Sequence, residues 1–498
     1  MKITFEKKPS QKPDTYVVFA TEGGKLTPPA QELDKKTEGA LKRAFGSEGF
    51  QGQKGKILTI PGPAGISAAH IVAVGLGKLV DLKASDFEKI GSSLVPELNA
   101  RKAVTAQVIF GDSLKHMPEE EIVTRMASGM LLNSYRFDKY LTKEPKEKKP
   151  TLKSAEFIVD AAAAARKKFD TSRKVADAVF LVRDLVSEAP NVLYPESFAN
   201  IIKRELSPLG IEVKILDRKD LKKLGMGALM SVGQGSVREE KLVTMHYKGG
   251  DKSQKNVAFV GKGVTFDTGG ISLKPGPGME DMKWDMAGAG VVTGLMKALA
   301  SRQAKVNAVG VVALAENMPS GMASRPGDIV RSMSGQTVEI LNTDAEGRLI
   351  LCDALWYCQE KFKPSQIVDL ATLTGAVIIA LGHEYGAVFS NDEVLSRDLV
   401  SAGKEVSEEL WPMPLNDAWD KAIDSPAADM KNISGGRDAG SAIGAHFLKR
   451  FIQKGVAWAH LDIAGVAWSA KDRPGVPKGA SAFGVRLLDR YVAEFCEK

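Results

Sequence analysis

Residues 256–275 read NVAFVGKGVTFDTGGISLKP, a compact apolar run that passes directly into a loop rich in glycine and charge. The apolar part, Asn256–Val260, has the length and composition of a buried β-strand. Lys262 and Asp267 follow it closely. Ligands of α/β proteins bind in the crevice beyond the carboxyl ends of the strands. We therefore expect these two side chains at a ligand site.

Strands and helices alternate along the rest of the chain, which predicts an α/β fold. In the first third, strands are expected at 16–20, 71–75 and 104–110, with amphipathic segments at 31–44 and 84–100. Beyond residue 191, strands are expected at 257–260, 308–314 and 367–370. The larger, C-terminal part is predicted to be a mixed sheet flanked by helices.

A chain of 498 residues is too long for one hydrophobic core, so two or more domains are expected. Valines and a leucine recur with helical spacing between residues 171 and 188, and this pattern ends before Pro190. We interpret it as a helix that connects two domains. The predicted domains are an N-terminal α/β domain at 1–168, the connecting helix at 169–189 and a second domain at 190–498.

Composition indicates a soluble globular protein, with 44% hydrophobic and 26% charged residues. The excess of 68 basic over 61 acidic residues is small for this length and favours solubility over nucleic-acid binding. Three cysteines cannot form a disulfide framework, and the first eight residues lack the apolar core of a signal peptide. The longest apolar run, 367–382, is interrupted by Asp369. We expect a cytoplasmic protein that does not enter a membrane.

Two further segments concentrate charge. Residues 342–349, NTDAEGRL, place Asp344, Glu346 and Arg348 directly before an apolar run, and Asp285 lies in the segment MKWDM at 282–286. Each has an ordinary interpretation when taken alone. The acids before the apolar run could cap a helix, and Asp285 could be a solvated residue on an amphipathic helix. Lys262 could bind phosphate, but its glycines lack the spacing of a phosphate-binding loop.

Taken together, the acids predict a metal site. Asp267, Asp285, Asp344 and Glu346 would repel one another if they converged, and each would raise the pKa of the others. Two divalent ions carry the four positive charges that four carboxylates need. Carboxylate oxygens suit Mg²⁺, Mn²⁺ and Zn²⁺. Histidine ligands are not indicated, because His383 lacks the second histidine of a zinc-binding helix and His460 is expected to be structural.

These segments are similar to the leucine aminopeptidase (cytosol aminopeptidase) family of two-metal exopeptidases. Residues 342–349 resemble its signature octapeptide, and residues 261–275 resemble its lysine–aspartate–lysine loop. Residues 425–429 and 460–465 resemble further family blocks. The likeness extends from about residue 173 to the end of the chain, whereas the first domain is matched mainly by position and α/β character. The resemblance implies that residues 190–498 form a catalytic metallopeptidase domain.

The resemblance also implies the role of each site residue. One divalent ion would be held by Lys262, Asp267, Asp285 and Glu346. The other would be held by Asp267, Asp344 and Glu346, with a contribution from the Asp344 carbonyl. A lysine ligand must be neutral, and adjacent dications can depress its pKa. Lys274 and Arg348 match the catalytic pair. Lys274 would stabilise the oxyanion, and Arg348 would hold a bicarbonate ion as general base.

The implied activity is removal of the N-terminal residue from peptides by water that two Mn²⁺ or Zn²⁺ ions activate. Met282, Thr372, Gly375 and Ala464 match the pocket for the first residue, which would favour leucine and other apolar residues. They could equally be core residues. The family also implies a homo-hexamer. Residues 439–445, residues 479–484 and Tyr194 depart from the family pattern. The alternative function is a DNA-binding architectural or regulatory protein on the same hexameric scaffold, which the pI of about 9.0 permits.

Overall fold

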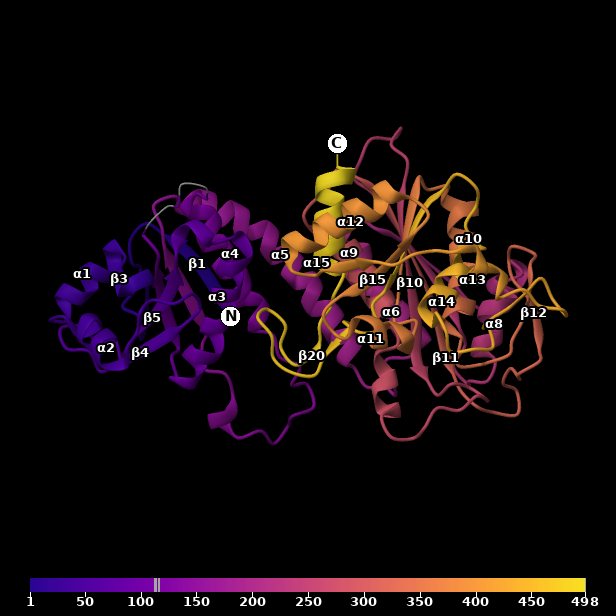
Figure 1. Cartoon of the computed structure of the whole chain (residues 1–498), viewed down its shortest axis with the longest axis horizontal. Helices are drawn as coiled ribbons and strands as arrows, with labels where there is room; N and C mark the ends of the chain where they lie inside the picture. Colours follow the sequence, from indigo (N-terminus) through magenta and orange to yellow (C-terminus); the bar gives the residue numbers. More distant parts are fainter. Residues whose placement is uncertain (112–113, 115–116, 498) are drawn as a thin grey trace. The chain divides into compact units, whose positions relative to one another are not determined.

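The computed structural model describes residues 1–111, Leu114 and 117–497. The chain forms two compact units, coloured along the sequence in Figure 1. The N-terminal unit comprises Met1–Ala176 and Lys471–Pro477, and the C-terminal unit comprises Asp177–Ala470 and Lys478–Lys498. Helix α5 (Ala162–Ser187) contains the residue at which the first unit gives way to the second.

The N-terminal unit contains a seven-stranded sheet in the order β1-β7-β6-β2-β5-β4, with β3 added beside β2. Its strands are β1 (Lys2–Glu6), β2 (Thr15–Thr21), β3 (Lys25–Leu26), β4 (Ile57–Pro61), β5 (His70–Gly77), β6 (Thr105–Ile109) and β7 (Ser154–Ile158). Along this order, the pairs β1–β7, β7–β6, β6–β2 and β2–β5 are parallel, whereas β4 pairs antiparallel with β5. Its remaining helices are α1 (Pro28–Lys36), α2 (Ala40–Glu48), α3 (Ala84–Ala100) and α4 (Glu119–Asn133). The predicted α/β architecture is therefore confirmed.

The amphipathic segment expected at 31–44 is two helices rather than one. Glu38 and Gly39 have φ values of +54° and +80°, in the left-handed region, so the backbone turns between α1 and α2. Gly39 tolerates that conformation because it has no Cβ. The hydrophobic periodicity continues across the break, and for this reason the pattern alone did not reveal it.

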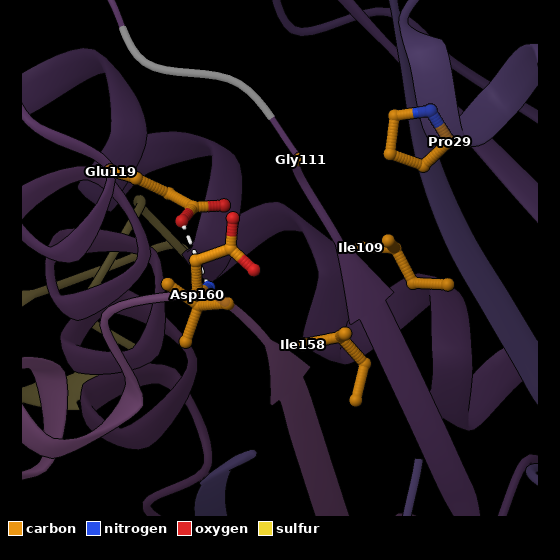
Figure 2. Close-up of a pocket in the computed structure, with 7 residues that line it drawn as sticks. Pro29, Ile109, Gly111, Glu119, Ile158 and Asp160 are labelled. Atoms are coloured by element: carbon orange, nitrogen blue, oxygen red, sulfur yellow. Dashed lines mark hydrogen bonds between the residues drawn. The ribbon is translucent and has the colours of Figure 1, made fainter. Parts of the chain in front are cut away.

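A cavity of about 410 Å³ opens at the carboxyl ends of β6 and β7 (Figure 2). Its two acidic residues are Glu119 and Asp160, and Figure 2 shows their carboxylates close together with Pro29 across the space. Glu119 accepts a hydrogen bond from the backbone N–H of Asp160 at 3.2 Å. Burial raises the pKa of Glu119. This carboxylate therefore ties the loop after β7 to the start of α4.

The C-terminal unit is built on an eight-stranded mixed sheet in the order β16-β15-β18-β14-β10-β11-β9-β8. Its strands are β8 (Glu212–Leu216), β9 (Lys241–Lys248), β10 (Val257–Asp267), β11 (Asn307–Asn317), β14 (Gln366–Ala371), β15 (Gly386–Ser390), β16 (Leu410–Pro412) and β18 (Ala457–Asp462). The central strands β11, β10, β14 and β18 are parallel, and β9 and β15 run antiparallel to their neighbours in this core. The mixed sheet expected for this part is confirmed.

Helices flank the sheet of the C-terminal unit (Figure 1). They are α6 (Pro195–Leu206), α7 (Arg218–Lys223), α8 (Gly227–Gly233), α9 (Ala287–Ser301), α10 (Gly347–Phe362), α11 (Gly375–Leu381), α12 (Glu393–Val406), α13 (Asp417–Lys421), α14 (Gly440–Lys449) and α15 (Val485–Tyr491). Short strands form a three-stranded sheet of β12 (Ile329–Arg331), β13 (Thr337–Glu339) and β17 (Met430–Lys431), and a hairpin of β19 (Trp468–Ser469) and β20 (Gly479–Ala480).

Helices α9 and α10 cover opposite faces of β10. Side chains alternate along a strand, so Ala258 and Val260 share one face and join the hydrophobic core that contains α10. On the other face, a Cβ on Gly261 would lie 2.7 Å from Cα of Ala289 in α9. Lys262 has the parity of Val260 and therefore points to the side of α10. Strand β10 thus places the Lys262 side chain at the start of α10.

Helix α10 carries a buried carboxylate that links it to α8. Asp353 is fully buried, and its two oxygens accept the N–H groups of Leu229 at 2.9 Å and Met333 at 2.8 Å. Burial raises the pKa of Asp353 to about 7, although these N–H groups oppose the shift. The folded protein therefore binds this proton more tightly than the unfolded chain does.

The raised pKa predicts a pH-dependent effect of Asp353→Asn on stability. The neutral carboxylic acid of Asp353 makes its full contribution to the free energy of unfolding below about pH 4. This contribution is lost as the pH rises through about 7. The free energy of unfolding of wild type minus that of Asp353→Asn should therefore fall by on the order of 4 kcal/mol over that range. Thermal unfolding between pH 4 and pH 8 measures this difference. Parallel pH profiles for the two proteins would contradict the assignment.

Among the described residues, we find no helix with the length and hydrophobicity required to span a bilayer.

Candidate metal centre

Lys262 lies at the centre of a buried charge cluster. Its Nζ atom is 2.8 Å from Oδ1 of Asp285 and 2.8 Å from Oε1 of Glu346, and it donates to the carbonyl of Thr372 at 2.8 Å. The side chain arrives from the middle of β10, where both neighbouring strands are parallel. Three segments far apart in the sequence therefore meet at one ammonium group.

The acids of the cluster lie at or next to the ends of secondary-structure elements. Asp267 is the last residue of β10, Asp285 follows the 3₁₀ helix Met279–Trp284, and Glu346 precedes α10. One carboxylate oxygen from each of Asp267, Asp344 and Glu346 lies within 4.8 Å of the others. The structure thus brings together all five residues that the resemblance assigned to metal binding.

Lys274 forms ion pairs with the other two acids, Asp267 and Asp344. Its Nζ atom is 2.9 Å from Oδ2 of Asp267 and also contacts Oδ1 of Asp344. Burial of Lys274 disfavours its charge, but the carboxylates of Asp267, Glu346 and Asp344 outweigh this and raise its pKa. Lys274 is therefore a fixed cation at the edge of the cluster, with 21% of its side chain exposed.

Neutral side chains orient the acids. Asn317 donates from Nδ2 to Oδ1 of Asp267 at 2.8 Å and to the carbonyl of Thr343 at 3.1 Å. The hydroxyl of Thr372 donates to Oδ1 of Asp285 at 2.7 Å. We did not predict Asn317 from the sequence. It reaches the site because the parallel register of β10 and β11 places it directly opposite Asp267.

The cluster suits divalent cations. The charge cluster comprises four carboxylates and two ammonium groups, so its net charge is −2 when all six groups are ionised. Its members are Asp267, Asp285, Asp344, Glu346, Lys262 and Lys274. Burial and the neighbouring Glu346 raise the pKa of Asp267 to about 6, and burial raises the pKa of Asp285 as well. Oδ2 of Asp285 is buried and has no hydrogen-bond partner among the described residues. A buried carboxylate oxygen with no partner among the described residues and a net negative charge both fit a site that binds metal cations.

Arg348 is the second residue of α10 and is buried. Its Nη1 atom donates to the carbonyl of Asn432 at 2.6 Å, whereas Nε is buried with no hydrogen-bond partner among the described residues. Burial lowers the pKa of Arg348 to about 10. The guanidinium therefore retains donor capacity for a small anion.

Of the residues expected to line a substrate pocket, Thr372 and Ala464 lie in loops, and Gly375 begins α11. Asp462, at the end of β18, accepts the hydroxyl of Thr374 at 2.6 Å and the N–H groups of Leu373 at 3.1 Å and Ala464 at 3.3 Å. This bonding holds the loop from Thr372 to Gly375 against Ala464. A Cβ on Gly375 would meet nothing within 4 Å. The structure therefore leaves open space beside that loop.

Met282, the fourth of these residues, belongs to the 3₁₀ helix that precedes Asp285. Its carbonyl accepts the N–H of Asp285 at 3.4 Å, so it is linked to the charge cluster. His460, by contrast, lies in the sheet, fully buried, with Nδ1 2.5 Å from Oδ1 of Asp369. Nδ1 of His460 is therefore paired with an acid outside the charge cluster, which fits the structural role expected for this histidine.

Gly347 provides a local test of how Lys262 is positioned. A Cβ on Gly347 would lie 2.7 Å from Cε and 2.8 Å from Nζ of Lys262. Gly347→Ala is therefore expected to displace Lys262 and to weaken divalent-ion affinity about 10- to 100-fold. Titration with Mn²⁺ against a fluorescent chelator measures the effect.

The matched control is Gly46→Ala in α2, where an added Cβ would meet nothing within 4 Å. This change should leave ion affinity at the wild-type value and raise stability slightly, because alanine favours a helix over glycine. Wild-type affinity in Gly347→Ala itself would show that ion binding does not depend on the position of Lys262.

Comparison with known proteins gives consistent results. Residues 180–489 match the model of the cytosol aminopeptidase family catalytic domain, and residues 17–144 match the model of its N-terminal domain. A probable cytosol aminopeptidase from Caulobacter vibrioides is 52% identical over 482 residues, 96% of each chain. One from Rhizobium etli is 50% identical over 461 residues, 92% of each chain.

Solved structures agree with the sequence comparison. A tomato leucine aminopeptidase mutant superposes with a TM-score of 0.88 at 32% identity, covering 99% of this chain and 96% of that one. The bottromycin maturation enzyme BotP in complex with Mn superposes with a TM-score of 0.84 at 31% identity, covering 96% of this chain and 99% of that one.

Proposed function

Because this chain belongs to the cytosol aminopeptidase family, we propose that its buried charge cluster is the two-metal catalytic site of an aminopeptidase. The protein is a metal-dependent hydrolase that removes the N-terminal residue of peptides. The observation that supports the site assignment most directly is the convergence of Asp267, Asp344 and Glu346 within 4.8 Å, next to the Lys262–Asp285 pair.

We assign one ion to Lys262, Asp267, Asp285 and Glu346. The second would be held by Asp267, Asp344 and Glu346, so that Asp267 and Glu346 would be shared by the two ions. Lys262 would have to be uncharged to act as a ligand, so its proton would have to leave when an ion binds. The ions are Mn²⁺ or Zn²⁺, and the Mn complex of the structural neighbour BotP supports the first. When bound, such ions acidify water and polarise a carbonyl group.

The chain itself supplies two cations for the reaction. Lys274, which contacts Asp267 and Asp344, is placed to stabilise negative charge that develops on the carbonyl oxygen of the substrate. Arg348 would hold the bicarbonate ion that serves as general base, and its buried Nε with no partner among the described residues supports this role.

The first residue of the substrate is assigned to the space beside Thr372, Gly375 and Ala464, with Met282 contributing from its short helix. Methyl, methylene and thioether groups on this surface favour leucine and other apolar residues. We further propose a homo-hexamer in the cytoplasm, on the strength of the family resemblance. The DNA-binding alternative finds no support in the named relatives.

The proposal is tested with purified protein and two paired substrates. Leucyl p-nitroanilide should be hydrolysed, whereas its N-acetylated form should not, because an exopeptidase of this class needs the free α-amine. Metal analysis should find two divalent ions per chain. Equal cleavage of both substrates, or activity in protein free of divalent ions, would overturn the assignment.

A further inference from the structure

Residues 425–432 approach the charge cluster without contributing a metal ligand. We propose that Asn432 is a positioning residue, which holds the loop from Leu341 to Arg348 in the conformation that the active site needs. This inference rests on the proposed function of that loop, which carries Asp344, Glu346 and Arg348. It also gives a role to the family-like block Ser425–Asp429, which the proposed chemistry leaves without one.

The Asn432 side chain is completely buried and uses both ends of its amide on this loop. Oδ1 accepts the backbone N–H of Leu341 at 2.9 Å and that of Asn342 at 3.3 Å. Nδ2 donates to the carbonyl of Asn342 at 2.6 Å. One planar amide therefore satisfies a donor and an acceptor of the same residue, which fixes the start of the loop.

The backbone of Asn432 fixes the other end. Its carbonyl accepts Nη1 of Arg348 at 2.6 Å. Asp344 and Glu346 lie between these two attachment points, two and four residues after Asn342. Loss of the Asn432 amide should therefore disturb the two carboxylates, because it frees the start of the loop that carries them, while the backbone bond to Arg348 is kept.

The small three-stranded sheet places Asn432 beside this loop. Strand β17 pairs parallel with β13, and the N–H of Asn432 donates to the carbonyl of Glu339 at 3.0 Å. The preceding block adds two side-chain attachments to β13. The hydroxyl of Ser425 donates to Glu339 at 2.5 Å, and Oδ2 of Asp429 accepts the N–H of Thr337 at 2.7 Å. Residues 425–432 are thus attached to β13 and act as a clamp. Within this clamp, Asn432 contacts the loop from Leu341 to Arg348.

The residues assigned to the substrate pocket come from other segments, and this separation predicts a distinctive kinetic result. Leu373, Thr374 and Ala464 are held by hydrogen bonds to Asp462, and none of these bonds involves Asn432. Loss of the Asn432 amide should therefore lower divalent-ion affinity and kcat by about 10- to 100-fold each, as is usual for residues that orient metal ligands. KM for leucyl p-nitroanilide, measured at saturating Mn²⁺, should stay near the wild-type value.

The experiment compares Asn432→Ala with Gln359→Ala in the full-length protein. Gln359 is buried in α10, and its amide also makes hydrogen bonds to three backbone groups, those of Leu355, Phe451 and Gln453. Both variants lose a buried amide, but Gln359 contacts no residue of the charge cluster in any of these bonds. Mn²⁺ affinity by chelator competition, kcat, KM and the thermal midpoint are measured for each. Only Asn432→Ala should lose ion affinity and kcat.

Asp429→Ala provides a milder variant should Asn432→Ala fail to fold. It removes the attachment of the clamp to Thr337 and should show the same pattern with smaller changes. The inference is overturned if the variant that folds keeps wild-type Mn²⁺ affinity and kcat, or loses no more of them than Gln359→Ala. Failure of the wild type to hydrolyse leucyl p-nitroanilide would instead overturn the proposed function, and Mn²⁺ affinity would still test the clamp.

Discussion

Chelation of divalent ions is expected to abolish hydrolysis of leucyl p-nitroanilide and to lower the thermal unfolding midpoint. The physical reason is the charge balance of the cluster, in which four acids, three of them buried, face two lysines. Without the ions, like charges repel and Oδ2 of Asp285 has no compensating partner among the described residues. Each site occupied at a 100-fold excess over its Kd stabilises the folded state by about 2.7 kcal/mol.

Readdition of Mn²⁺ or Zn²⁺ should restore activity and the thermal midpoint together. The matched control is the double variant Asp267→Asn/Glu346→Gln, which keeps side-chain size but removes both bridging carboxylates. Chelator should leave its midpoint unchanged, because it has little bound ion to lose. A wild-type midpoint that does not respond to chelator would show that the ions contribute nothing to folding of this site.

The sequence predicted the fold class because each element carries its own local pattern. The strand at 257–260, for example, is an apolar run bounded by polar residues, and it forms the first part of β10. Boundaries were harder to predict. The alanine-rich segment 161–165 has no helical periodicity of its own, yet Ala162 begins α5 as the first turn of a long helix. Local composition does not reveal where a helix begins, because tertiary packing supplies most of the stability of a helix in a protein.

The charge cluster was predicted partly from chemistry and partly from resemblance. Carboxylates set among glycines and apolar residues pointed to a metal site, whereas the assignment of each ligand came from the family. Orienting residues were missed because they depend on register and packing. Asn317 lies opposite Asp267 only through the pairing of β10 with β11, and Asn432 reaches Asn342 only through the small sheet. A single asparagine in a sequence carries no signal of either contact.

Lys274→Ala is expected to lower kcat by about 10²- to 10³-fold, the usual cost of removing one group that stabilises an oxyanion. Metal content should be retained. Lys274 is a cation in contact with Asp267 and Asp344, so its loss removes a competitor for these carboxylates and should tighten ion binding. Reduced turnover combined with equal or greater Mn²⁺ affinity is a result that a metal ligand could not produce.

The matched control is Lys297→Ala in α9. Both lysine side chains are 21% exposed, and each forms an ion pair, which for Lys297 is with Glu205 at 3.0 Å. Lys297→Ala should retain wild-type kcat, because a partly exposed ion pair outside the site contributes at most about 1 kcal/mol to stability. Equal kcat values for the two variants would remove Lys274 from the catalytic machinery. A large loss of Mn²⁺ in Lys274→Ala would instead make it part of the metal site, since only a group that helps to hold the ions can release them when it is removed.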